Sequence, residues 1–160
     1  MNKFIKLLAT GFYIGEKVPA PGTAASIAAA LVYWILYNIF GPFNPSAYWT
    51  IMLFVIVIGI FVSGRAANDI YCEADPPEVV IDEIAGMIIA LAFFPEPTLC
   101  LIILGLAIFR ILDIFKIYPI NKLEIIAGGT GIMIDDIFAG VLTNVLLRVI
   151  LFSATIIVPS

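Results

Sequence analysis

Long stretches of this chain carry no charged side chain, and they restrict the structures it can form more than any other feature. Pro45–Gly64 and Pro97–Phe109, for example, contain no Asp, Glu, Lys or Arg. Over the whole chain 62% of residues are hydrophobic and 12% are charged, whereas soluble domains have about half and about a quarter. A chain this apolar is expected to lie in a lipid bilayer, so we predict an integral membrane protein.

Five segments are candidates for crossing the bilayer, and most are shorter than the ~20 residues that a full crossing needs. A short amphipathic stretch, Lys3–Tyr13, precedes them and predicts an interfacial helix. We therefore expect one domain over residues 1–160, an all-α integral membrane protein with a compact bundle of about four to five transmembrane helices. The candidate crossings are Ala24–Phe40, Ala47–Ser63, Ile84–Phe94, Thr98–Phe109 with its continuation toward Phe115, and Ile137–Val158.

Alternation of these crossings places nearly all the polar sequence on one membrane face. Residues 65–83 and 110–136 return to the side of the N-terminal segment, and only Glu96 is charged on the other side. Arg148 does not fit, because near the middle of the last crossing it must snorkel, face the bundle interior or mark an earlier helix end. The positive-inside rule makes the polar face cytoplasmic, since it carries Lys3, Lys6, Lys17, Arg65, Arg110, Lys116 and Lys122.

Several classes of protein are excluded by what the sequence lacks. Scattered basic residues form no stripe for nucleic acid, so no nucleic-acid partner is expected. The chain has no histidine, which excludes phosphatases with a phosphohistidine intermediate. Neither Cys72 nor Cys100 precedes the phosphate-binding loop and arginine of a cysteine phosphatase. Asp-x-Asp, Walker A and dinucleotide-binding motifs do not occur.

Two pairs of adjacent acidic residues lie between apolar flanks, and they are the strongest functional signal. The pairs are Asp82-Glu83 and Asp135-Asp136, and Asp113 is predicted on the same membrane face. Carboxylates entering a membrane segment are costly unless a cation neutralises them. Oxygen ligands without histidine suit Mg²⁺ or another hard cation, so we expect such an ion as the cofactor.

Positions suited to binding phosphate accompany the acidic pairs. Pro19-Ala-Pro-Gly-Thr23 predicts a turn with Thr23 as helix N-cap, although a plain turn and cap is the simpler interpretation of that stretch alone. Gly128-Gly-Thr-Gly131 predicts a glycine-rich turn before the second acidic pair. Arg110 and Lys116 add positive charge. Together these features indicate metal-assisted phosphoryl transfer or hydrolysis.

At these residues the sequence resembles the phosphatidylglycerophosphatase A family over nearly the whole chain. The resemblance implies a Mg²⁺-dependent enzyme of the bacterial inner membrane whose active site is on the cytoplasmic face. Its phospholipid substrate would be phosphatidylglycerophosphate, hydrolysed to phosphatidylglycerol and inorganic phosphate. The matching blocks are Pro19–Thr23 with Ser26, Val79–Gly86, Arg110-x-x-Asp113-x-x-Lys116 with Pro119-Ile120, and Gly128–Asp136 with Ala139-Gly140.

The acidic framework and the resemblance together identify the candidate site residues. Whether a carboxylate or a water molecule attacks phosphorus is left open by the spacing. Departures from the family pattern at Ala25, Ile117 and Ala127 concern local loop geometry. The candidate catalytic residues are Asp82, Glu83, Asp113, Asp135 and Asp136, of which Asp82, Glu83, Asp135 and Asp136 are also candidate metal ligands. The candidate phosphate-binding residues are Thr23, Arg110, Lys116, Gly128, Gly129 and Gly131.

Three other functions are compatible with a membrane protein of this kind. A cation transporter is the main alternative, because intramembrane carboxylates also line ion paths. The acidic residues, however, concentrate on one face and do not continue to the other. A structural subunit would leave the clustered charges unexplained, and the Asp-Gly-x-x-Ala-Arg pattern of membrane alcohol phosphotransferases does not occur.

Overall fold

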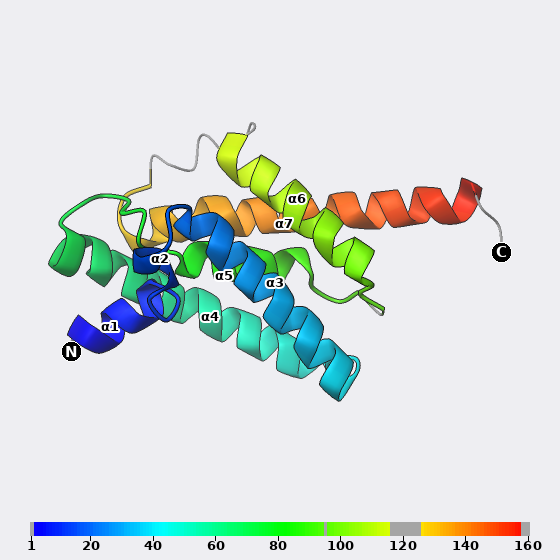
Figure 1. Cartoon of the computed structure of the whole chain (residues 1–160), viewed down its shortest axis with the longest axis horizontal. Helices are drawn as coiled ribbons and strands as arrows, with labels where there is room; N and C mark the ends of the chain where they lie inside the picture. Colours follow the sequence, from blue (N-terminus) through cyan, green and yellow to red (C-terminus); the bar gives the residue numbers. More distant parts are fainter. Residues whose placement is uncertain (1, 95, 116–125, 158–160) are drawn as a thin grey trace.

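The computed structural model describes residues 2–94, 96–115 and 126–157, and within these ranges all regular secondary structure is helical (Figure 1). The predicted all-α class is confirmed for the described residues. A π-helical turn, η1 (Ala67–Tyr71), continues the fourth helix. The helices are α1 (Asn2–Ala9), α2 (Ile14–Lys17), α3 (Pro21–Phe40), α4 (Pro45–Ala66), α5 (Ile81–Ala90), α6 (Leu99–Phe115) and α7 (Gly129–Ile157).

Three helical stretches in the described residues are long and apolar enough to cross a membrane: α3, α4 continued by η1, and α7 over Gly129–Ala154. Helices α3 and α4 begin earlier than predicted, at Pro21 and Pro45, because proline at the first helical position sacrifices no hydrogen bond. Their outer surfaces expose large apolar side chains, such as Phe54 and Phe152. Such surfaces suit contact with acyl chains rather than water.

Helix α5 differs most from the expectation, because its ten residues replace the crossing predicted over Ile84–Phe94. At 1.5 Å per residue it is about 15 Å long, half the thickness of the hydrocarbon core. It begins at Ile81 and ends at Ala90, after which the chain turns at Phe93, which has a positive φ of 60°. This helix therefore cannot cross a bilayer alone; it packs between α3, α4 and α7 (Figure 1).

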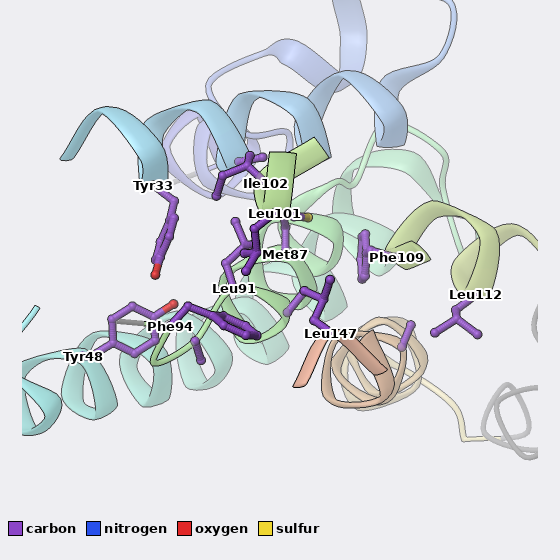
Figure 2. Close-up of a cluster of buried hydrophobic side chains, with 14 residues drawn as sticks. Tyr33, Tyr48, Met87, Leu91, Phe94, Leu101, Ile102, Phe109, Leu112 and Leu147 are labelled. Carbon is purple, nitrogen blue, oxygen red and sulfur yellow. The ribbon is translucent and has the colours of Figure 1, made fainter. Parts of the chain in front are cut away.

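The main hydrophobic core surrounds α5 and joins it to its neighbours. Figure 2 shows Met87 of α5 and Leu91, which directly follows it, among side chains from the other long helices. Phe109 of α6 and Leu147 of α7 are almost fully buried there. Tyr33 and Tyr48 lie at one end of this core, the end that is farther from the N-terminus of α5 (Figure 2).

The predicted N-terminal amphipathic segment, Lys3–Tyr13, contains α1 and the turn after it, and α2 follows. Helix α1 packs on α4 and α2 packs on α3. Ile5 and Ala9 are buried, and the Ala9 carbonyl accepts a 2.8 Å hydrogen bond from the Val80 N–H. Lys6 Nζ lies 2.5 Å from Glu16 Oε1 and thereby joins α1 to α2. The hydrogen bond with Lys6 lowers the pKa of the Glu16 carboxyl. These contacts hold the segment that leads into α5.

Candidate active site

The ends of four helices enclose a polar cavity of about 290 Å³. Its walls are the first turns of α3 and α5, the last turns of α6, the second turn of α7, and the segment before α5. Sequence blocks that lie far apart in the chain thus share one site, as the alternation of crossings predicts. The lining residues are Ala20, Pro21, Gly22, Thr23, Asp75, Pro76, Pro77, Val79, Asp82, Glu83, Arg110, Asp113, Asp135 and Asp136.

Three carboxylates at this cavity are close enough to share a metal ion. One oxygen from each of Asp82, Glu83 and Asp136 lies within 4.8 Å of the other two. Each side chain also has a buried oxygen without a hydrogen-bond partner: Asp82 Oδ1, Glu83 Oε2 and Asp136 Oδ2. Buried anions so close together are unfavourable without a cation. An all-oxygen donor set suits a hard divalent ion, so these residues fit the Mg²⁺ expected from the sequence.

Close packing of two glycines brings the carboxylates of α5 and α7 together. A Cβ atom on Gly140 would overlap the Gly86 carbonyl, and one on Gly86 would lie 2.7 Å from the Asp136 carbonyl oxygen. Both overlaps involve backbone, which cannot move aside without separating the helices. Asp82 and Glu83 lie in the first turn of α5, where the helix dipole favours negative charge.

Arg110 supplies the positive charge of the cavity. Its Nη1 lies 2.5 Å from Asp113 Oδ2 and 3.9 Å from Glu83 Oε1. These contacts hold the guanidinium in place, yet Nη1 and Nε are buried without aligned hydrogen-bond partners. Arginine binds phosphate through several N–H groups at once. The orphaned donors are therefore suited to an anionic ligand in the cavity.

The first turn of α3 forms another wall, and there the prediction that Thr23 caps the helix is wrong. Helix α3 begins at Pro21 and Ala20 occupies the cap position, so Thr23 is the third helical residue. Proline is favoured at the first position because its missing N–H is one that the helix cannot use. A Cβ atom on the adjacent Gly22 would overlap Glu83 Oε1 and lie 3.2 Å from Arg110 Nη1. Glycine at this position thus leaves room for the Glu83 carboxylate.

The glycine-rich segment also differs from its prediction as a turn. Gly128 precedes α7 with a φ of +79°, but Gly129 and Gly131 belong to the first turn of the helix. A Cβ atom on Gly129 would overlap the Ile60 carbonyl oxygen of α4. Gly128 and Gly131 line a neighbouring cavity of about 390 Å³ instead of the site cavity.

Asp135 lies where these two cavities meet, since it lines both. Its Oδ1 accepts a 3.1 Å hydrogen bond from the Asp136 N–H, and it is not among the three carboxylates that could share an ion. Asp75 also lines both cavities and was not predicted, because an acidic residue before two prolines matches no motif. The predicted phosphate-binding residue Lys116 lies outside the described residues.

Comparison with known proteins gives one consistent family. A family model described as Phosphatidylglycerophosphatase A matches residues 7–151. Phosphatidylglycerophosphatase A of Escherichia coli (strain K12) is 38% identical over 138 residues, which cover 86% of this chain and 77% of that protein. The protein of that name from Haemophilus influenzae is 35% identical over 138 residues, 86% of this chain and 82% of its own.

A protein of Bacteroides thetaiotaomicron, provisionally named a phosphatidylinositol-3-phosphatase, is 36% identical over 147 residues. The match covers 89% of this chain and 91% of that protein. No solved structure gives a significant match.

Proposed function

Since the chain belongs to the phosphatidylglycerophosphatase A family, we propose that it is a Mg²⁺-dependent enzyme that hydrolyses phosphatidylglycerophosphate to phosphatidylglycerol and inorganic phosphate. The observation that carries this proposal is the carboxylate group of Asp82, Glu83 and Asp136 beside a half-buried Arg110, whose Nε and Nη1 lack aligned hydrogen-bond partners. Negative ligands for a cation and positive donors for a phosphate line one cavity. That pairing is what hydrolysis of a phosphate monoester requires.

The three carboxylates would hold the metal ion, and each has a buried oxygen without a hydrogen-bond partner. When bound, Mg²⁺ supplies Lewis acidity toward a phosphoryl oxygen. Arg110 would bind the other phosphate oxygens through its guanidinium N–H groups, among which Nε has no hydrogen-bond partner. Asp113 Oδ2 holds the guanidinium through Nη1, 2.5 Å away. Gly22 and Thr23 add the first N–H groups of α3, which have no acceptor within their own helix.

The location of the cavity suits a lipid substrate. It is formed at helix ends, so a head-group phosphate can enter while the acyl chains stay beside the apolar surfaces of the helices. We propose that this end faces the cytoplasm of a bacterial inner membrane, because Lys6, Lys17 and Arg65 lie on the segments around it. A transporter would need polar groups along its whole path, whereas a large hydrophobic core surrounds α5 between the cavity and the far end of that helix.

Phosphate release from phosphatidylglycerophosphate by the purified full chain, with Mg²⁺ or with a chelator, tests the proposal. We expect Mg²⁺-dependent release that falls about a hundredfold or more in Asp82→Asn and Asp136→Asn. Asp69→Asn is the matched control, because Asp69 is outside the cavity and pairs with Arg65. Full activity in both site variants would refute the site. Metal uptake by sealed vesicles without phosphate release would favour a transporter.

Head-group choice needs its own comparison, since a relative is named for phosphatidylinositol phosphate. The values of kcat/KM for phosphatidylglycerophosphate, phosphatidylinositol 3-phosphate and phosphatidic acid should be measured in the same mixed micelles. We expect phosphatidylglycerophosphate to give the highest value. A higher kcat/KM for either competitor would replace the proposed substrate while leaving the metal site and the reaction class in place.

A further inference from the structure

The C-terminal end of α5 packs within the helical bundle, where Ile89 and Ala90 are buried. Leu91 and Phe94, just beyond the helix, are buried in the main core. The last carbonyls of a helix lack partners within it, and a carbonyl left unpaired in an apolar environment is strongly unfavourable. A helix that ends here therefore needs donors from elsewhere in the chain.

Some of these donors are close by: the Leu91 N–H donates to the Met87 carbonyl, and Tyr48 Oη donates to the Ile88 carbonyl at 2.5 Å. Two side chains of α7 bind the carbonyls that follow. Asn144 Nδ2 donates to the carbonyls of Ile89, Ala90 and Ala92, at 3.2, 3.1 and 2.9 Å. Arg148 Nη2 donates to the carbonyls of Ala92 and Phe93, at 3.0 and 3.3 Å. The two side chains are also joined, since Arg148 Nε donates to Asn144 Oδ1 at 2.8 Å. We call Asn144 and Arg148 the α5 cap.

The α5 cap explains why an arginine occurs within the last apolar helix. Its guanidinium binds carbonyls and lies 4.8 Å from the centre of the Phe94 ring, so the charge is satisfied within the protein. A cation at a helix C-terminus is also favoured by the helix dipole. Of the three interpretations open from the sequence, a place in the bundle interior is wrong, because Arg148 is exposed on α7 and its guanidinium instead reaches the carbonyls that follow α5.

The α5 cap belongs to a series of contacts between α5 and α7 that ends at the carboxylates. The series pairs Asp82 with Asp136, Gly86 with Gly140, and Ala90 with Asn144. Each pair is four residues from the next on both helices, so α5 and α7 run side by side in the same direction (Figure 1). A slip of one residue would move one helix by about 1.5 Å and turn its side chains by about 100°.

From this series we infer that Asn144 and Arg148 are positioning residues for the metal site. Asn144 binds the last carbonyls of α5 and Arg148 binds those just beyond it, at the end opposite the carboxylates. Measured along α7, Asn144 is about 12 Å and Arg148 about 18 Å from Asp136. The glycine contact sets how close the two helices come, while the directional hydrogen bonds of the α5 cap set their register. Register fixes where the Asp136 carboxylate lies relative to Asp82 and Glu83. This inference rests on the metal site proposed above.

The test compares metal affinity with stability in the full chain, using Asn144→Leu and Arg148→Met. Mn²⁺ serves as a spectroscopic probe of the site, and its affinity is measured by electron paramagnetic resonance in detergent, without turnover. Tm is measured in parallel in a chelator. Leu147→Ala is the matched control, since it creates a cavity on the same stretch of α7 without removing a donor to α5.

We expect either cap variant to weaken Mn²⁺ binding about tenfold, the lower end of the losses caused by removing groups that orient metal ligands. Arg148→Lys should restore part of this loss, because it keeps a charged donor. Leu147→Ala should lower Tm without weakening Mn²⁺ binding. If Asn144→Leu does not fold, Arg148→Met decides the question, because Arg148 lies on the exposed side of α7.

Three results would count against the inference, and they identify what fails. Wild-type affinity in the folded cap variants would overturn the positioning role while leaving the proposed function intact. Equal weakening in Leu147→Ala at a matched Tm would also overturn it, because general destabilisation would then explain the loss. Absence of Mn²⁺ binding in the wild-type protein would overturn the proposed metal site and, with it, this inference.

Discussion

The substitution Gly22→Ala should change the geometry of the site without lowering the stability of the protein. Gly22 lies in the first turn of α3, and its added Cβ atom would overlap Glu83 Oε1. Because that atom is the end of a flexible side chain, the carboxylate can swing away at little cost to folding. Alanine also forms helix better than glycine, by about 1 kcal/mol in a helix interior. We therefore expect Tm to stay constant or rise.

The cost of Gly22→Ala should appear in the site instead. Real Cβ contacts are essentially never shorter than 3.0 Å, so Glu83 Oε1 must withdraw by about 1 Å. A displacement of that size in a catalytic site reduces rates by about a hundredfold. It also removes Glu83 from the group of carboxylates that could hold a metal ion. We therefore expect kcat to fall about a hundredfold and metal affinity to fall with it.

Phosphate release, Mn²⁺ affinity and Tm should be measured together for Gly22→Ala and for the control Gly105→Ala. Gly105 is a helical glycine of α6 whose Cβ atom would meet only side-chain methyl groups, at 3.1 Å. We expect the control to keep both activity and metal affinity. Wild-type activity in Gly22→Ala would refute the role given to Glu83. A large loss of Tm in Gly22→Ala would show that the backbone, and not the Glu83 side chain, moves to relieve the clash.

Three further predictions concern charges. Asp136→Asn should raise Tm in a chelator, because one of three clustered carboxylates loses its charge. Mg²⁺ should no longer stabilise this variant, whereas Mg²⁺ at a hundred times its Kd should raise the free energy of unfolding of the wild-type protein by about 2.7 kcal/mol. Arg110→Lys should raise KM for the lipid phosphate about tenfold at constant Tm, because one charge-assisted hydrogen bond of about 1.5 kcal/mol is lost. An unchanged KM would contradict the phosphate-binding role of Arg110. The pKa of Glu16 is lowered, so its pair with Lys6 stabilises the protein above the ordinary carboxyl pKa of 4.5 and ceases to do so as the pH falls through the lowered value. Lys6→Met should therefore lower the free energy of unfolding by less than about 1 kcal/mol at pH 7. A difference in stability between Lys6→Met and the wild-type protein that persisted in acid would refute this assignment.

The sequence was sufficient to predict the helical class and the set of polar segments that meet at one end of the bundle. Alternation of apolar segments decides which loops share a face, so the proximity of Asp82, Glu83, Arg110 and Asp136 follows from it. The positions of Gly128–Gly131 did not follow, because glycine favours both turns and close helix contacts. Only the position of Ile60 across the bundle shows that Gly129 serves the second purpose.

The length of α5 could not be predicted for a similar reason. Its apolar run continues through Leu91–Phe94, so composition gives no sign that the helix ends at Ala90. Carbonyls at and just beyond this end are bound by donors more than fifty residues away, on α7. Local periodicity contains no information about such partners, whereas an arginine in an apolar helix shows that some partner must exist.

The two features that a bilayer penalises most, the acidic pair and Arg148, contact opposite ends of α5. Glu83 and Asp82 lie at its N-terminus, where the dipole favours anions, and Arg148 binds carbonyls at its C-terminus, where the dipole favours cations. A helix long enough to cross the membrane would carry its C-terminal carbonyls to water and leave Arg148 without this role. A half-length helix instead needs the α5 cap. Because the α5 cap joins it to α7, the same contacts that satisfy the helix end also fix the position of Asp136 beside Asp82.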